Sequence, residues 1–373
     1  MKTARVVLGV CALAVWSQPV FAQTVDTRVA FFAERYKFDP GLVYNKIRQY
    51  TVPVGVTVPI GRRGHVALST GFTSVELFSA DKTQLNDQYV NGVIDTELRI
   101  GWNAIPNRLM LIATGTIPTG ITAVQTPELS VLGALASDII GFTAPSLGAG
   151  GGVGFGFAGA IPIGRWALGI GATARETFRY EAVAGAQRLK PGSEARVRVG
   201  LEGSLGQRTY VRVAGVLAHR RKDIIGDSTV NGIGNRLVGH LSVNHGISNT
   251  MLVAYVFDVF RDNPQIEPTA VGAAILPRGN LFGAGLNWVI PAWRMVVTPK
   301  AEFRYSRQAQ LEGDGALQRA GQSLRLAVDL RYPIGQRFAV VGQGSWVTGY
   351  LVQGGTDVGF WGTRGSIHAE WRP

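Results

Sequence analysis

The sequence predicts an all-β fold, namely a transmembrane antiparallel up-and-down β-barrel of about 16 strands, with about 14 as the alternative. Three observations predict it. The composition is poor in charge and rich in glycine, since 17% of the residues are charged and 49 of the 373 are glycine. Segments of about ten residues alternate between apolar and polar side chains. The connections between these segments are alternately short and long.

The composition argues against several other classes of protein. Soluble domains carry roughly 25% charged residues, which is more than this chain has. The 46% hydrophobic content is too high for a disordered chain. The chain has 37 Lys and Arg against 25 Asp and Glu, but the basic residues are dispersed along it. We therefore expect no binding to nucleic acid.

Residues 1–22 are predicted to form a signal peptide. Two basic residues precede an apolar run at 6–16, which is too short to cross a bilayer as a helix. Small residues favour cleavage after Ala22. A lipoprotein signal is the alternative, but Cys11 lies within the apolar run and not after it. Cleavage would leave residues 23–373 as the β-barrel, without a cysteine and hence without a disulfide or a thiolate metal site.

The alternation is clearest in residues 323–332, where one face carries Leu324, Leu326, Val328, Leu330 and Tyr332. Residues 92–102, 196–202 and 295–306 repeat the pattern. In a transmembrane barrel the apolar face meets lipid and the polar face lines the interior. Strands of about 9–11 residues, with aromatic residues at the ends of their apolar faces, favour a barrel in a membrane over a soluble sandwich.

The connections give the strand count and the orientation. Short turns are predicted at 59–62, 103–108, 162–165, 204–208, 246–250, 290–294 and 333–337. Longer polar stretches lie at 78–91, 179–192, 220–234, 262–278, 308–322 and 350–361. This is typical of tight periplasmic turns and longer external loops, with both ends of the barrel on the periplasmic side. The count is about 16 if the first hairpin, at about 25–58, belongs to the barrel, and about 14 otherwise.

Charged residues on the inner face are the first candidate site. A barrel this wide has a lumen that side chains cannot fill, so we expect its polar face to be hydrated. The predicted lumen-lining and selectivity residues are Arg196, Arg198, Lys300, Glu302, Arg304, Arg325, Asp329 and Arg331. They are interpreted either as a paired network that braces the wall or as a positive field that favours anionic solutes.

The connection at 117–150 is the second candidate site, because it is the longest and is richer in apolar residues than a solvated loop should be. A helix start at 126–128 precedes apolar residues at near-helical spacing, namely Leu129, Leu132, Leu135, Ile139 and Ile140. One interpretation is a surface helix packed on its own loop. The other is a segment folded into or over the lumen, which would form a gate or a binding groove.

Motifs for other chemistry are weak. The G-x-G-x-x-G pattern at 154–159 alternates with Phe155 and Phe157 and is interpreted as a strand face, not as a dinucleotide site. His240 and Ser242 could share a face, as a hydrolase would need, but that face is predicted to be lumenal and away from lipid. The five histidines lie on different segments. We expect no enzyme activity, no metal site and no cofactor.

Four features occur in order between about residues 105 and 205: the apolar helical loop, a Gly-rich strand at 153–159, the segment 164–172, and Pro191–Glu194 before an alternating strand. In this pattern the chain resembles the outer-membrane transporters of fatty acids and aromatic hydrocarbons. The resemblance implies transport of hydrophobic solutes, an entry groove formed by external loops, and an N-terminal hatch. Few residues separate Ala22 from the first alternating segment, so we do not expect a large hatch.

These observations predict a passive channel in the bacterial outer membrane, exported by its signal peptide, for small hydrophobic or amphipathic solutes or for anions. The expected partners are outer-membrane lipids, lipopolysaccharide, a small-molecule solute and the barrel-assembly machinery, since the last strand, with Trp371 near its end, resembles an outer-membrane assembly signal. The alternatives are a non-transporting structural or adhesive barrel and, further away, a lipid-modifying enzyme.

Overall fold

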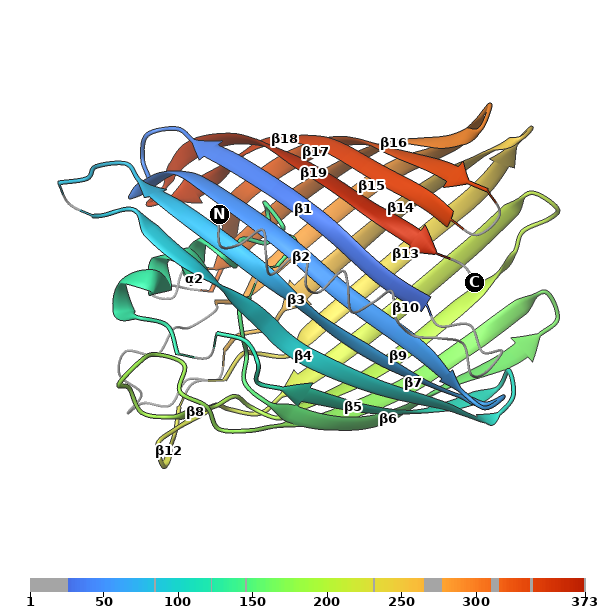
Figure 1. Ribbon diagram of the computed structural model, residues 1–373. Helices are drawn as coiled ribbons and strands as arrows, with labels where there is room; N and C mark the ends of the chain where they lie inside the picture. Colours follow the sequence, from blue (N-terminus) through green and yellow to red (C-terminus); the bar gives the residue numbers. More distant parts are fainter. Residues whose placement is uncertain are drawn as a thin grey trace.

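The computed structural model describes residues 26–371, except 84, 122, 145, 231, 265–276, 310–314 and 336–337. The predicted signal peptide therefore lies outside the described residues. Sixteen antiparallel strands form a closed barrel, in which β1 (Asp26–Phe38) pairs with β19 (Thr356–Trp371) (Figure 1). The all-β barrel class is confirmed. The first hairpin belongs to the barrel, so the higher of the two predicted strand counts is correct.

The strands between these two pair in chain order around the barrel. Their bounds are β2 (Tyr44–Ile60), β3 (Gly64–Ser79), β4 (Gln88–Ile105), β5 (Leu109–Ile117), β6 (Gly152–Ile163), β7 (Trp166–Thr177), β9 (Glu194–Ser204), β10 (Thr209–Arg220), β13 (Arg236–Ile247), β14 (Thr250–Arg261), β15 (Gly279–Ala292), β16 (Met295–Ala309), β17 (Leu317–Ile334) and β18 (Phe338–Gln353). A small separate sheet contains β8 (Leu189–Lys190), β11 (Ile224–Ile225) and β12 (Ser228–Thr229).

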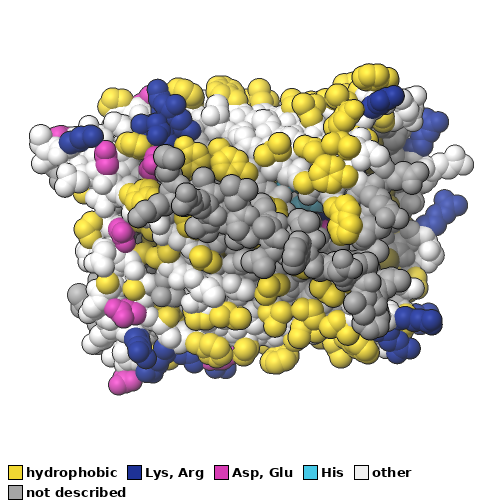
Figure 2. Space-filling view, viewed as in Figure 1, with side chains coloured by type: hydrophobic (Ala, Val, Ile, Leu, Met, Phe, Trp, Pro, Cys, Tyr) yellow, Lys and Arg dark blue, Asp and Glu magenta, His cyan; other side chains and the backbone are white. Residues whose placement is uncertain are grey.

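The outer surface of the barrel is apolar. On β17, the side chains of Leu324, Leu326, Val328 and Leu330 are 39–46% exposed, whereas the alternate residues Ser323 and Ala327 are buried. Figure 2 shows apolar side chains spread over the side of the barrel, with charged side chains gathered toward its two ends. A band of this kind is what lipid chains would cover, and its alternation is the one that the sequence predicts.

The short turns lie together at the end of the barrel where β1 begins and β19 ends, since Arg28 pairs with Glu370 in the register of these strands. This is the right-hand end in Figure 1. Each of these turns contains a residue in the left-handed backbone region, which glycine adopts without strain. Gly61 and Gly164, at φ 57° and 59°, fill this position in the repeated Pro-Ile-Gly turns, and Trp293 fills it at φ 55° in another.

The long connections lie at the opposite end, but one prediction there is wrong. Residues 350–361 do not form a long loop. They are mostly strand residues of β18 and β19, joined by Gly354 and Gly355 at φ 57° and 82°. Two residues with positive φ suffice for a tight hairpin, so the strands continue beyond the predicted ten residues. Both strands are 16 residues long.

Helix is confined to the connection between β5 and β6 in the part of the chain that the structure describes. It comprises a 3-10 turn, η1 (Thr126–Glu128), and one short α-helix, α2 (Leu129–Leu135). The helical segment begins at 126–128, as the sequence signal predicts, and Glu128 closes a capping box with Gln125. Across the described residues, we find no helix with the length and apolar character needed to cross a membrane.

Candidate transport passage and inward loop

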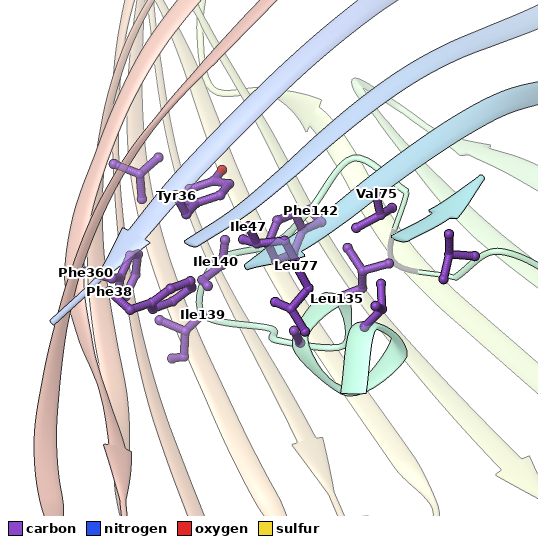
Figure 3. Close-up of a cluster of buried hydrophobic side chains, with 14 of the residues drawn as sticks. Tyr36, Phe38, Ile47, Val75, Leu77, Leu135, Ile139, Ile140, Phe142 and Phe360 are labelled. Atoms are coloured by element: carbon purple, nitrogen blue, oxygen red, sulfur yellow. The ribbon is translucent and has the colours of Figure 1, made fainter. Parts of the chain in front are cut away.

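The connection 117–150, here called the inward loop, carries α2 at the end of the barrel with the long connections (Figure 1), and its residues 138–144 lie against the inner face of the wall. Figure 3 shows its residues Leu135, Ile139, Ile140 and Phe142 among side chains that β1, β2 and β3 point inward. The buried cluster contains these four residues with Val131, Leu147, Tyr36, Phe38, Ile47, Val75, Leu77, Val90, Val347, Val358 and Phe360. The apolar residues of the loop are therefore covered by the barrel wall, and the loop is not a surface helix packed on itself.

Among the predicted gate residues, the structure separates two groups. Leu135, Ile139 and Ile140 are at most 5% exposed and face the wall, so they do not line a passage. Leu132 is partly buried against the same cluster. Leu129, also a predicted gate residue, is 42% exposed and is therefore accessible to a solute.

Four consecutive carbonyl groups of the inward loop, at residues 138–141, accept hydrogen bonds from the barrel wall. Arg304 Nη1 donates to the carbonyl of Asp138 at 2.9 Å, and Arg325 Nη2 donates to that of Ile140 at 2.9 Å. Ser323 Oγ donates to the carbonyl of Ile139 at 2.8 Å, and Arg364 Nη2 donates to that of Gly141 at 2.5 Å. Carbonyl oxygens carry partial negative charge, so the three guanidinium donors in this row form charge-assisted hydrogen bonds with them.

Carboxylates and an amide hold the remaining backbone of the loop. Glu34 Oε2 accepts from the Thr143 N–H at 2.9 Å. Asp95 accepts from the N–H groups of Gly120 and Ala149 at 2.9 and 2.7 Å, at the two roots of the loop. Gln49 donates to the Ala144 carbonyl at 2.7 Å and accepts from the Ala144 N–H at 3.4 Å. The loop is therefore tied to the wall both at its roots and at its tip.

Seven of the eight predicted lumenal residues belong to paired groups, and six of these seven lie on β16 and β17. Glu302 accepts from Tyr255 Oη at 2.7 Å and from Arg304 Nε at 2.9 Å, and it lies 3.8 Å from Arg325 Nη1. The other ion pairs are Lys300 with Asp329, and Arg331 with Glu370 at 3.1 Å. The side chains that sequence analysis groups as a selectivity lining therefore brace the wall and the inward loop at these positions.

Arg196 and Arg198, the other two, lie on a different part of the wall. Residues opposite one another in adjacent strands share a face, so the register carries the lumenal face of Glu302 from β16 to β9. It runs through Gly285, Tyr255, Ser242, Arg212 and Glu202. On β9, Arg196 and Arg198 lie on the same face as Glu202, while Val197 and Val199 are each 49% exposed on the outer face.

The lumen beside these arginines is open. The Arg196 side chain pairs with Glu194 of the same strand and is still 57% exposed, although it points inward. Its cross-strand neighbours are small, since Thr173 and Ala218 stand opposite it. Arg198 stands opposite Gly171 and Val216, and within the described residues it forms no ion pair. A recess continues along the wall beside Arg196 and is lined by Glu97, Arg99, Thr114, Thr173, Arg175 and Glu194.

In the described part of the chain, the remaining motifs do not bring catalytic or metal-binding side chains together. His240 and Ser242 share the lumenal face of β13, but no hydrogen bond joins them. The G-x-G-x-x-G pattern lies within β6, where Phe155 is 68% exposed on the outer face. We find no group of three or more His, Cys, Asp or Glu arranged to hold a metal ion among the described residues.

Sequence reasoning missed the wall residues that receive the inward loop. The rule that apolar residues face lipid fails for Tyr36, Ile47, Val75 and Leu77, which are apolar and lumenal. A signal was present at 75–78, where Val75 and Leu77 alternate with Glu76 and Phe78, so that both faces of the strand carry apolar side chains. The sequence does not indicate that Glu34, Gln49 and Asp95 bind the inward loop, because their partners are distant in sequence.

No protein-family model and no curated protein sequence matches the chain. Similar solved structures include OccAB3 of Acinetobacter baumannii, at 10% identity over 94% of this chain and 100% of that one, with a TM-score of 0.49. OpdQ of Pseudomonas aeruginosa is 9% identical over 93% and 97%, with a TM-score of 0.48. The outer-membrane protein OmpT of Vibrio cholerae is 11% identical over 95% and 99%, with a TM-score of 0.44. The likeness shows the barrel fold alone. None of the three proteins is described as a transporter of fatty acids or aromatic hydrocarbons.

Proposed function

We propose that this chain is an outer-membrane barrel that works as a passive channel for small organic anions. The observation that carries the proposal is the pair Arg196 and Arg198, which project into open lumen on a part of the wall that the inward loop does not cover. Arg198 forms no ion pair among the described residues, and Arg196 pairs with Glu194 of its own strand but stays 57% exposed. Arg304, Arg325 and Arg331 are less exposed, and each is bound to a carbonyl group or a carboxylate. Arg198, with the exposed Arg196 beside it, therefore supplies positive charge to the passage, and a cationic lining favours anionic solutes.

The solute that fits this passage has an apolar part as well as a charge. The exposed residues of the inward loop include Leu129, Gly133, Ala136 and Ala149, which are small or apolar. The facing wall carries Thr173, Gly171 and Ala218 beside its arginines. A monocarboxylate with a short aliphatic or aromatic body would place its charge near Arg196 and Arg198 and its apolar part near the loop. This retains the predicted amphipathic class and narrows it to anions.

Conductance in planar bilayers tests the proposal directly. The refolded chain from residue 23 to residue 373 should give steady steps with a permeability ratio that favours anions. Changing Arg196 and Arg198 together to Gln should bring that ratio toward unity, whereas changing Arg188, which is exposed in an external connection, should leave it unaltered. A protein that inserts without conducting, even after deletion of residues 127–146, would indicate the structural or adhesive alternative. A cation-selective wild type would contradict the assignment to anions.

A further inference from the structure

The end of the barrel with the tight turns carries arginines that the passage does not use. They are here called the turn arginines and comprise Arg62, Arg63, Arg108, Arg165, Arg208 and Arg294. All of them are exposed, their turns contain no Asp or Glu, and none forms an ion pair with a described residue. Figure 2 shows Lys and Arg side chains along this end, at the right.

Several charges in the connections at the other end are paired with one another. Lys82 lies 3.0 Å from Asp87, and Arg179 lies 3.5 Å from Asp227. Arg319 lies 2.8 Å from Asp357. Mutual pairing leaves little net field for an external partner, whereas like charges without counterions attract an anionic one. The six turn arginines are thus a cluster of like charges without acidic partners among the described residues.

The turn arginines lie just beyond the lipid-facing surface. Ile60 and Ile163, which are 48% and 52% exposed, precede Arg62 and Arg165 by two residues. Leu205, 60% exposed, precedes Arg208 by three residues. At about 3.3 Å per residue, the guanidinium groups lie within roughly 10 Å of the last lipid-facing side chain. The headgroup layer is about 5–8 Å thick on each side of a bilayer, so these groups lie at its depth.

Trp293 is a second, independent indication of an interface at this depth. Its side chain is 92% exposed, and its backbone has a φ of 55°, which is rare for a bulky residue. The Arg294 guanidinium lies 5.4 Å from the centroid of the Trp293 ring. Tryptophan is enriched at headgroup depth in membrane proteins, where its ring and its N–H are both accommodated. An exposed Trp beside an Arg suits a lipid headgroup layer better than bulk water.

We propose that the turn arginines bind the phosphate groups of anionic phospholipids, of the phosphatidylglycerol type, in the leaflet that surrounds the turn end. Guanidinium groups recognise phosphate by paired hydrogen bonds, and several of them around one rim act together. The ring would fix the depth and tilt of the barrel. This inference rests on membrane insertion from the proposed function, but it does not require that any solute passes through the lumen.

Lipid selectivity can be measured with spin-labelled lipids on the full refolded chain. The protein is reconstituted in phosphatidylcholine vesicles that contain either labelled phosphatidylglycerol or labelled phosphatidylcholine. The motionally restricted fraction of each label gives their relative association constant. The test variant changes Arg62, Arg63 and Arg165 to Gln. The matched control removes three cations from the opposite end, by changing Lys82, Arg179 and Arg188 to Gln.

We expect wild type to prefer phosphatidylglycerol by about threefold or more, and we expect 1 M salt to abolish the preference. The turn variant should approach a ratio of one, and the control should match wild type. No preference in wild type, or an equal loss in the control, would overturn the proposal. A second assay measures whether each protein pellets with purified peptidoglycan. If wild type shows no lipid preference but pellets, and only the turn variant fails to pellet, then peptidoglycan is the partner instead. Absence of any restricted lipid would contradict membrane insertion and hence the proposed function.

Discussion

Arg364 of β19 and Gly141 of the inward loop are 223 residues apart and are joined by a hydrogen bond of 2.5 Å from Nη2 to the carbonyl oxygen. The same guanidinium pairs with Glu34 of β1. β1 and β19 are the strands whose pairing closes the barrel. One side chain therefore links the closing seam to the inward loop, which couples the stability of the barrel to the position of the loop.

Changing Arg364 to Gln should destabilise the protein and release the tip of the inward loop. The Glu34 side chain is fully buried and that of Arg364 is 12% exposed, so the change leaves a buried carboxylate without its cation. Losing one partner of a buried pair costs about 3–5 kcal/mol. Guanidinium unfolding of the reconstituted barrel should show this loss, and single-channel records should show larger or noisier steps. Arg28→Gln removes an exposed pair with Asp26 and should cost less than about 1 kcal/mol. Equal losses in the two variants would contradict the special role of Arg364.

Gly141 to Ala should disturb the row of carbonyl contacts. Gly141 has a φ of 62°, and a Cβ there would lie 2.2 Å from Arg304 Nη1. Left-handed backbone strain costs about 1–2 kcal/mol, and the clash would displace Arg304 from the Asp138 carbonyl. Gly133→Ala is the matched control, because a Cβ there meets nothing within 4 Å and the residue lies in α2. Gly133→Ala should keep or raise stability, as Ala favours helix. Hydrogen exchange of the loop amides distinguishes the two, and unchanged exchange in Gly141→Ala would show that the contacts do not fix the loop.

The connection between β3 and β4 should loosen as the pH falls. The side chain and backbone N–H of Thr83 donate to Asp81, and hydrogen bonds with Lys82 and Ser79 hold Asp87, so the pKa of each carboxyl lies below the ordinary Asp value. A carboxyl with a lowered pKa stabilises the folded loop above the unfolded-state pKa, and this contribution is lost as the pH falls through the folded-state value. Hydrogen exchange at residues 80–87 should therefore accelerate below about pH 4. The double variant Asp81→Asn and Asp87→Asn should exchange rapidly at every pH. If acidification accelerated exchange in that variant as much as in wild type, the pH dependence would belong to other groups.

The sequence predicts the barrel better than it predicts its contents. Leu324 to Leu330 alternate with polar residues because a strand has a period of two, so the facing of β17 follows from local pattern alone. Arg325 and Arg198 look alike at this level, since each alternates with apolar residues. One is bound to the Ile140 carbonyl and the other projects into open lumen, and that difference depends on contacts such as Arg325 to Ile140, 185 residues apart. Apolar inner residues such as Tyr36 and Val75 become interpretable only once the loop that covers them is placed.

The two kinds of apolar residue on the inward loop should respond differently to truncation. Leu135 is 1% exposed against the wall, so Leu135→Ala should cost about 2–5 kcal/mol and should loosen the loop. Leu129 is 42% exposed, so Leu129→Ala should cost well under half of that. If the passage takes organic anions with an apolar part, Leu129→Ala should lower the permeability of benzoate relative to chloride. Leu135→Ala should raise the permeability of both anions as the lumen widens. Bi-ionic reversal potentials and unfolding curves on the same preparations measure both effects. An unchanged benzoate-to-chloride ratio in Leu129→Ala would remove the loop from solute recognition and leave the arginines of β9 as its determinant.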